Sequence, residues 1–376
     1  MTSKNQLKLC ALSIILAVHS FVLGSGCSSR ATHEGENFAV IAYCNGPASA
    51  VDSYPVELLT HVQYSFLHVR SDGSVPVGGR DSANITHLVS LKSRNAHLKV
   101  LLSVGGWGGC KSCSGVFASG EGRHQVASTL GKILERFGAD GIDIDWEYPA
   151  IAGYPGHPFG SDDRHNFTLL IEELRSVVGD THEVSFAAGG FTEYLESSVE
   201  WNLVMPLVDR VNLMTYDLVN ASSTVTGHHT PLFSTPSQAE SVDHAVRYLD
   251  SVGVPHSKIV IGAAFYARMW DHVADQNNGL YQSGTFKAYV NFKEMASYYE
   301  RVGGMRQFWD SVAQAPYAYS ASAGLFATFD DPRSIDLKTR YALRNRLGGI
   351  MFWELSGDRV SGGLLEAISR ARTEGQ

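Results

Sequence analysis

The chain has 376 residues, of which 44% are hydrophobic and 18% charged, and its formal net charge is −8. This composition is that of a globular protein, and the length fits one large α/β domain with an insertion or two ordinary domains. The acidic balance gives no sign of a nucleic-acid-binding patch and disfavours binding to anionic membrane headgroups.

The first 26 residues have the pattern of a secretory signal peptide. Lys4 and Lys8 precede an apolar run that is too short and too polar to span a bilayer, and small residues follow it. We therefore expect a secreted protein with a signal at 1–26 and a short tether at 27–37, without a membrane span. A buried first helix is one alternative. The segment before Cys27 also resembles a bacterial lipoprotein cleavage site, so a lipid anchor at Cys27 is another.

The cysteines give no zinc site. Cys110 and Cys113 form a C-x-x-C pair without a second pair elsewhere, which excludes a four-cysteine zinc centre. In an exported chain this pair is expected to form a small local disulfide, with a thioredoxin-like redox role as the alternative. Cys44 lies in an apolar run and is expected to be a core residue.

Eight short apolar segments recur along the chain, with amphipathic helical patterns between several of them. The segments are Phe38–Asn45, His61–Val69, Leu98–Gly106, Gly141–Pro149, Val184–Gly190, Arg210–Leu218, Ile259–Arg268 and Gly348–Leu355. The helical patterns are Glu121–Phe137, Asp163–Val178, Gln238–Val252 and Ser334–Arg346. Several strands are almost continuously hydrophobic, as parallel strands covered on both faces are. This alternation predicts that residues 38–376 form a (β/α)8 TIM barrel rather than an open sheet, since no nucleotide-binding glycine pattern follows the first strand.

One connection is far longer than an ordinary loop. Between the seventh strand and its helix, residues of about 269–328 are rich in Tyr, Phe and Gly, with an alternating stretch at Thr285–Phe292 and a helical one at Lys293–Arg301. We interpret this segment as a small α+β insertion at the carboxyl face of the barrel. Barrel enzymes place their sites at that face, so the insertion is expected to form one wall of a cleft.

The fourth strand is acidic on one side. In the segment 140–149, which reads D-G-I-D-I-D-W-E-Y-P, the side chains of Asp143, Asp145 and Glu147 alternate with Ile and Trp. The apolar side can pack on helices, so the carboxylates must face the barrel interior. They cannot all ionise in such a space, and this crowding is typical of a tuned general acid. The alternatives are an exposed acidic strand, which the apolar residues contradict, and a metal site, which lacks a supporting histidine. No metal or cofactor is expected.

This segment resembles the D-x-x-D-x-D-x-E signature of family 18 glycoside hydrolases, the chitinase family. Further similarities fall at other strand ends: S-V-G-G at Ser103–Gly106, M-T-Y-D at Met214–Asp217, Y-A-R at Tyr266–Arg268, and Trp353. The third motif carries Ala where the family has Gly. The insertion is similar to that of bacterial-type, deep-cleft chitinases.

The resemblance implies a role for each catalytic residue. Glu147 would protonate the glycosidic oxygen, and Asp145 would orient the substrate's acetamido group to attack the anomeric carbon, giving an oxazolinium intermediate. Tyr216 would donate a hydrogen bond to the acetamide, and Asp143 would share a proton with Asp145. The configuration at the anomeric carbon would be retained.

Eight further residues are expected to bind the substrate: Tyr43, Ser103, Trp107, Met214, Asp217, Tyr266, Arg268 and Trp353. Trp353 would form the floor under the reacting sugar, and Tyr43 and Ser103 could also hydrogen-bond Asp143. Trp107 and, less directly, Trp270 could line outer subsites, whereas Trp146 is expected in the core. The pair His228–His229 is interpreted as loop residues near the cleft rather than as metal ligands.

These features predict a secreted, monomeric chitinase that hydrolyses β-1,4-linked N-acetylglucosamine polymers, with endo-action expected rather than exo-action. Its partners would be chitin and chitooligosaccharides. One alternative is a non-catalytic chitin-binding lectin on the same scaffold, although such lectins lack the proton donor that Glu147 supplies. The other is a family 18 enzyme that acts on N-glycans or peptidoglycan.

Overall fold

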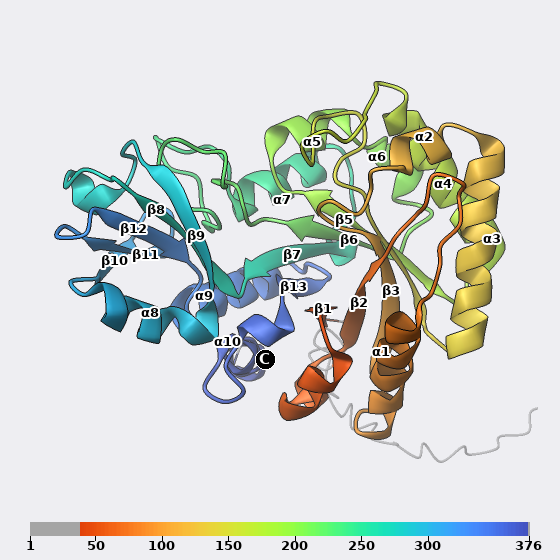
Figure 1. The fold of residues 1–376 in the computed structure, drawn as a ribbon, viewed down its shortest axis with the longest axis horizontal. Coiled ribbons are helices and arrows are strands. Elements are labelled where there is room, and N and C mark those ends of the chain that lie inside the picture. The colour runs from red at the N-terminus through yellow and green to blue at the C-terminus, as the bar shows by residue number, and fades with distance from the viewer. Residues whose placement is uncertain (1–37, 375–376) are drawn as a thin grey trace, which may run out of the picture.

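The structure, a computed structural model, describes residues 38–374. The predicted signal peptide at 1–26 and the whole predicted tether at 27–37, including Cys27, lie outside the described residues. The described chain forms a closed barrel of eight parallel strands in the order β1-β13-β7-β6-β5-β4-β3-β2, with a separate five-stranded antiparallel sheet beside it (Figure 1). The predicted TIM barrel with an inserted α+β unit is confirmed.

The elements alternate as the sequence predicts. The barrel strands are β1 Ala39–Asn45, β2 His61–Leu67, β3 Lys99–Gly105, β4 Gly141–Asp145, β5 Glu183–Gly189, β6 Arg210–Met214, β7 Ile259–Ala264 and β13 Gly349–Trp353. The helices around them are α1 Gly79–Ser90, α2 Cys113–Phe117, α3 Gly120–Phe137, α4 Asp163–Val178, α5 Thr192–Ser197, α6 Trp201–Val204, α7 Val242–Ser251, α9 Pro332–Arg344 and α10 Leu364–Glu374. The connection from β1 to β2 contains only two short 3-10 helices, at Ala48–Ser53 and Val56–Leu58.

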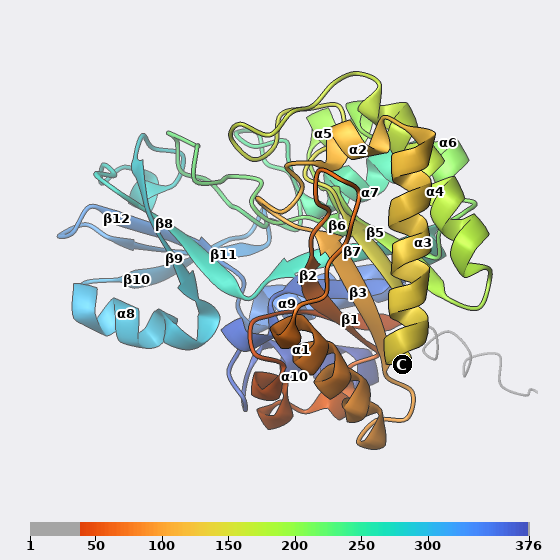
Figure 2. The ribbon, with the colours of Figure 1, turned by 45° about the vertical axis from the view of Figure 1, so that its right-hand side comes forward.

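The insertion forms the second sheet. It comprises β8 Tyr266–Asp271, β9 Thr285–Asn291, α8 Met295–Val302, β10 Arg306–Asp310, β11 Ala315–Ser320 and β12 Leu325–Phe329. The single strand predicted at Ile259–Arg268 is therefore wrong. The chain changes sheets at Phe265, because β7 pairs with barrel strands whereas β8 pairs antiparallel with β9 and β12. The insertion lies to one side of the barrel (Figures 1 and 2).

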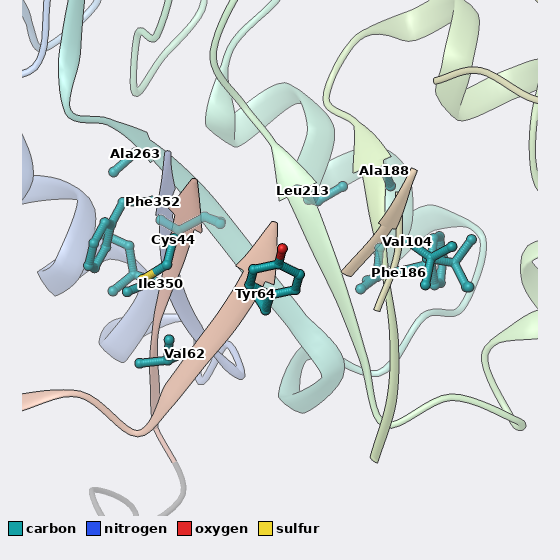
Figure 3. Packing of buried hydrophobic residues seen from close by; sticks show 14 of the residues in the cluster. Cys44, Val62, Tyr64, Val104, Phe186, Ala188, Leu213, Ala263, Ile350 and Phe352 are labelled. Atoms are coloured by element: carbon teal, nitrogen blue, oxygen red, sulfur yellow. The ribbon is translucent and has the colours of Figure 1, made fainter. Parts of the chain in front are cut away.

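Side-chain alternation divides each barrel strand into two faces. The outward residues, such as Cys44, Val62 and Phe186, are buried against the surrounding helices (Figure 3), which confirms Cys44 as a core residue. The inward face is apolar at Ile41 and polar at Asp143. Burial of the outward faces stabilises the barrel. The polar side chains on the inward face are therefore available for binding or catalysis.

The insertion is tied to the barrel by the long loop 215–241 between β6 and α7. Trp270 Nε1 donates to the carbonyl oxygen of Ser223 at 2.9 Å, Thr226 Oγ1 donates to that of Gly279 at 2.6 Å, and Leu232 N donates to that of Ala313 at 3.0 Å. Hydrogen bonds along the loop thus connect the barrel to the insertion at several places.

A buried ion pair marks the point where the chain leaves the barrel and returns to it. Lys338 Nζ of α9 lies 2.8 and 2.7 Å from the two carboxylate oxygens of Asp330 and 2.5 Å from Thr230 Oγ1, and Lys338 and Asp330 are both buried. Asp330 Oδ2 also accepts a hydrogen bond from the N–H of Ala264, the last residue of β7, at 3.0 Å. Both ends of the insertion therefore meet at Asp330.

Candidate active site

The acidic residues of β4 lie inside the barrel, toward the carboxyl ends of the strands. Asp143 and Asp145 are buried on the inward face, and Glu147 follows the end of the strand and is partly exposed. β4 ends at Asp145, four residues before the predicted end at Pro149. Glu147 therefore lies at the rim, where a substrate can reach it.

Asp143 is held by four side-chain donors. Its Oδ2 accepts hydrogen bonds from Tyr43 Oη at 3.0 Å and Ser103 Oγ at 2.8 Å, as expected from the sequence. Its Oδ1 accepts from Ser185 Oγ at 2.7 Å and Asn212 Nδ2 at 3.0 Å. Burial raises the pKa of Asp143, and the four hydrogen bonds act in the opposite direction. Asp143 is therefore fixed in place at the base of the site, and the substrate-binding roles of Tyr43 and Ser103 stay predictions.

Ser185 and Asn212 were not predicted. Each lies among apolar residues inside its strand, β5 or β6, after the charged first residue of that strand, and each is buried and donates to Asp143 on the inward side. The alternation of side chains along each strand could have found them. It places both residues on the inward side of the barrel, where the carboxylates of β4 lie.

Asp145 and Glu147 are both poised to hold protons. Burial, followed by the negative charges of Glu147 and Asp143, raises the pKa of Asp145 well above its ordinary value. Burial is also the main cause that raises the pKa of Glu147 to about 8. A carboxyl group with this pKa is protonated at neutral pH and can act as a general acid.

Asp145 also has an unused acceptor. Its Oδ1 is buried, and no residue within 38–374 donates a hydrogen bond to it. Buried polar atoms are normally paired, so an unpaired carboxylate oxygen next to the general acid fits a ligand N–H.

Tyr216 lies beside these carboxyl groups. Burial, followed by the charges of Asp145 and Glu147, raises the pKa of its phenol well above the ordinary value, so it remains an O–H donor. Met214, which is buried, belongs to a small apolar cluster with Met351 and Trp353 next to Tyr216. The M-T-Y-D motif thus supplies a donor and part of an apolar wall.

Asp217, Tyr266 and Arg268 form a connected polar group between the barrel and the insertion. Tyr266 Oη and Arg268 Nε each donate to Asp217 Oδ1 at 2.7 Å, and the second Arg268 nitrogen contacts Oδ2. Burial would raise the pKa of Asp217, but hydrogen bonds from His229 and Arg268 lower it below its ordinary value. Asp217 is therefore a fixed negative charge near Glu147.

Aromatic rings pack together at the carboxyl ends of β1, β2 and β13. Trp353 stacks on Phe66 with centroids 5.6 Å apart and planes 11° apart, and Tyr43 lies 5.9 Å away. Phe66, in an ordinary apolar segment, was not predicted. Trp107 is 58% exposed, and Trp146 is in the core as expected.

The expectation that Trp270 could line a subsite is wrong. Its side chain is fully buried in the apolar cluster of the insertion, where it packs on Phe286 and Phe326. Its exposure depended on packing within the insertion sheet, which the sequence pattern did not specify.

The two adjacent histidines are buried loop residues. His228 Nε2 lies 3.2 Å from Asp310 Oδ2 of the insertion, and His229 Nδ1 lies 3.5 Å from Asp217 Oδ1. Within residues 38–374 no cluster of three or more potential His, Cys, Asp or Glu ligands is present. Cys110 and Cys113 form the expected disulfide.

Comparison with known proteins shows which family has this arrangement of residues. The pattern of the family described as Glycosyl hydrolases family 18 matches residues 32–358. The chain belongs to this family. Chitinase A1 of Niallia circulans is 34% identical over 76% of this chain and 43% of its own, and Chitinase B of Serratia marcescens is 28% identical over 86% and 78%. A solved family 18 N-acetylglucosaminidase from Paenibacillus barengoltzii is 35% identical, with a TM-score of 0.81, over 89% of this chain and 100% of that one.

The chain thus spans less than half of Chitinase A1 and about four-fifths of Chitinase B. The family match covers most of the barrel and the insertion, including every site residue named above. In the described part of this family 18 chain, no helix has the length and apolarity that crossing a bilayer requires.

Proposed function

We propose that this family 18 protein is a chitinase that hydrolyses β-1,4 bonds between N-acetylglucosamine units by substrate-assisted catalysis. The observation that carries the proposal is the line of Asp143, Asp145 and Glu147, in which the outermost group has a pKa raised to about 8. The unpaired oxygen of Asp145 next to it suits the N–H of an acetamido group.

In the first step, Glu147 gives its proton to the glycosidic oxygen as the bond to the anomeric carbon breaks. The carbonyl oxygen of the acetamido group attacks the anomeric carbon and forms a cyclic oxazolinium ion. Asp145 accepts a hydrogen bond from the acetamide N–H and stabilises the positive charge of the oxazolinium ion. Tyr216 donates a hydrogen bond to the acetamide.

In the second step, Glu147, now a carboxylate, takes a proton from water. The resulting oxygen attacks the anomeric carbon from the side that the leaving group vacated, and the oxazolinium ring opens. Two successive inversions retain the configuration, with the substrate supplying the nucleophile in place of a second enzyme carboxylate. Asp143, held by four donors, stays in place and shares a proton with Asp145.

The remaining site residues are proposed to bind the sugar. Trp353 and Phe66 offer a stacked apolar surface to the C–H face of the pyranose ring. Asp217 and Arg268, which hold each other at the junction with the insertion, are placed to hydrogen-bond sugar hydroxyls. Met214 lines the wall beside them.

Hydrolysis of a chromogenic chitobioside by the purified protein tests the proposal, with Glu147→Gln as the matched control. Turnover by the wild type and its loss in the variant are expected. Binding of chitooligosaccharides without turnover by the wild type would favour a lectin instead. Preferred cleavage of N-glycans or peptidoglycan over chitin oligomers would reject the substrate class.

Endo-action belongs to the same proposal, because the insertion stands beside the barrel and can bound a long cleft. The similarity to an N-acetylglucosaminidase favours the second candidate, the release of single N-acetylglucosamine units. Product analysis over time on chitohexaose separates the two: endo-action gives dimers to tetramers first, and the alternative gives monomer and pentamer.

We also propose that the protein is exported and acts as a monomer. The similarity to two bacterial chitinases supports export, since an insoluble polymer cannot enter a cell. Cell fractionation and size-exclusion chromatography with light scattering test the two points.

A further inference from the structure

One inward-facing residue of the barrel, Gln63, carries a buried amide that the proposed mechanism does not use. Gln63 alternates along β2 with Val62 and Tyr64, which pack among the outward core residues (Figure 3), so its side chain points into the barrel. The residue is fully buried. Within residues 38–374, neither its amide nitrogen nor its amide oxygen has a hydrogen-bond partner.

Gln63 belongs to the same layer of the barrel as Asp143. Side chains inside an eight-stranded barrel form layers of about four, and alternate strands supply each layer. The strands β2, β4, β6 and β13 alternate in the barrel order. Their inward residues near mid-strand are Gln63, Asp143, Asn212 and Met351, which we call the Asp143 layer. Two members are joined directly, since Asn212 Nδ2 donates to Asp143 Oδ1 at 3.0 Å.

Gln63 and Asn212 face each other across the barrel axis. The strands β2 and β6 are four places apart in the closed order of eight strands, so they lie on opposite sides of the barrel. The Oδ1 atom of Asn212 is also buried, and no group in the described part of the chain donates to it. The two amides therefore present three unpaired polar atoms to the interior of one layer: Gln63 Nε2, Gln63 Oε1 and Asn212 Oδ1.

Water is the ligand that suits these atoms. Buried polar atoms are normally paired, and a buried water molecule makes about three hydrogen bonds, as donor and as acceptor. The unpaired set contains one donor, Gln63 Nε2, and two acceptor oxygens, and water can serve both kinds. A cation suits the set poorly, because Ca²⁺ takes about six to eight oxygen ligands and the N–H donor would face it.

We propose that Gln63 and Asn212 hold buried water in the Asp143 layer, and that Gln63 is thereby a positioning residue for Asp143. Gln63 acts on this carboxylate through the water and Asn212, and not by contact with the sugar. The water site stands on the geometry of the barrel alone. Its effect on turnover rests on the proposed function.

The water determines which end of the Asn212 amide faces Asp143. The two ends of an amide have nearly the same shape, but only the nitrogen end donates a hydrogen bond to a carboxylate. Water that donates to Asn212 Oδ1 favours the orientation in which Nδ2 donates to Asp143. Asp143 in turn acts on Asp145 through its charge, so a displaced Asp143 carboxylate alters the residue that orients the acetamide.

A high-resolution crystal structure of the protein tests the site directly. The expected result is ordered water within hydrogen-bond distance of the Gln63 amide and of Asn212 Oδ1. A direct hydrogen bond between the two amides rejects the water site. A bound cation, or density for neither water nor ion between these side chains, rejects it as well.

Gln63→Met tests the effect on catalysis, because Met has a similar length and lacks the amide. We expect kcat on chitohexaose to fall about three- to tenfold, the range that corresponds to one net hydrogen bond, with KM unchanged. Leu101→Met is the matched control. Leu101 is fully buried and lies opposite Gln63 in the β2–β3 register, and its substitution should leave kcat unchanged.

Gln63→Glu adds a readout that a packing role would not change. At the acid end of the pH profile, the neutral carboxylic acid offers one donor and one acceptor, as the amide does, so kcat relative to the wild type should be restored. As pH rises, the new carboxyl group ionises beside Asp143, and kcat should fall more steeply than that of the wild type.

The outcomes separate this inference from the proposed function. An active wild type with unchanged kcat in Gln63→Met rejects the positioning role. An equal loss in Leu101→Met, or a Gln63→Glu loss that is the same at every pH, also rejects it, because either result indicates a packing effect. If the wild type turns over no chitin substrate, the proposed function fails, and the crystal structure still decides the water site.

Discussion

Replacing Glu147 with Gln should stabilise the protein while abolishing turnover, and the gain should depend on pH. The pKa of Glu147 is about 8 in the folded protein against an ordinary value of 4.5. The folded state therefore holds the proton more tightly than the unfolded state. The sign follows: the native state loses stability as pH rises from about 4.5 to about 8, because the carboxylate must then be charged in a partly desolvated place. Gln carries no such charge.

The size of the effect follows from the same two pKa values. Raising the pKa of Glu147 from 4.5 to about 8 corresponds to about 5 kcal/mol of differential free energy. Because part of the side chain is exposed, solvent screening reduces this to about 2–3 kcal/mol. Glu147→Gln should therefore match the wild type in unfolding free energy near pH 4.5 and exceed it by this amount near pH 8.5.

Urea unfolding followed by tryptophan fluorescence at both pH values measures the difference. Leu203→Ala, exposed on α6, controls for general effects of pH on a surface variant. An equal difference between Glu147→Gln and wild type at the two pH values would refute the reasoning, as would a more stable wild type near pH 8.5. Either result would mean that Glu147 is not a desolvated acid.

Three further predictions concern Glu147, Asp145 and the buried Lys338–Asp330 pair. The kcat/KM of the wild type on a chromogenic chitobioside should fall as pH rises through about 8, since Glu147 must be protonated to act; a profile that is flat to pH 9.5 would contradict this. Asp145→Ala should lower kcat by about 10²–10³-fold in steady-state assays, because the acetamide and the oxazolinium charge lose their partner; near-normal kcat would exclude that role. Lys338→Met should lower the unfolding free energy by about 3–5 kcal/mol in urea titrations, because it leaves Asp330 charged and buried. The double variant Lys338→Met with Asp330→Leu should lose less, and a larger loss would show that the charge is not the cause.

The barrel and its acidic strand could be predicted because both depend on local regularities. Alternation along β4 alone places Asp143 and Asp145 on one face, and the apolar partners decide which face points inward. Strand and helix alternation then fixes the fold class, because parallel strands with helical crossovers close in few ways.

The features that were missed depend on contacts between distant segments. The apolar run through Phe265 reads as one strand, and only the competing partners β9 and β13 show that it divides. Trp270 looks like any tryptophan at a cleft until the insertion packs around it. Asn212 carries no motif, because its importance comes only from the carboxylate on the strand two places away.

Because the insertion starts and ends beside Asp330, it is attached to the barrel at one position. The chain that leaves β7 at Ala264 and the chain that enters α9 are held by one carboxylate. We therefore expect that a segment of another length whose two ends meet Asp330 in the same way leaves the register of the eight barrel strands unchanged. The size of the insertion can thus change without moving Asp143 and Asp145 on β4.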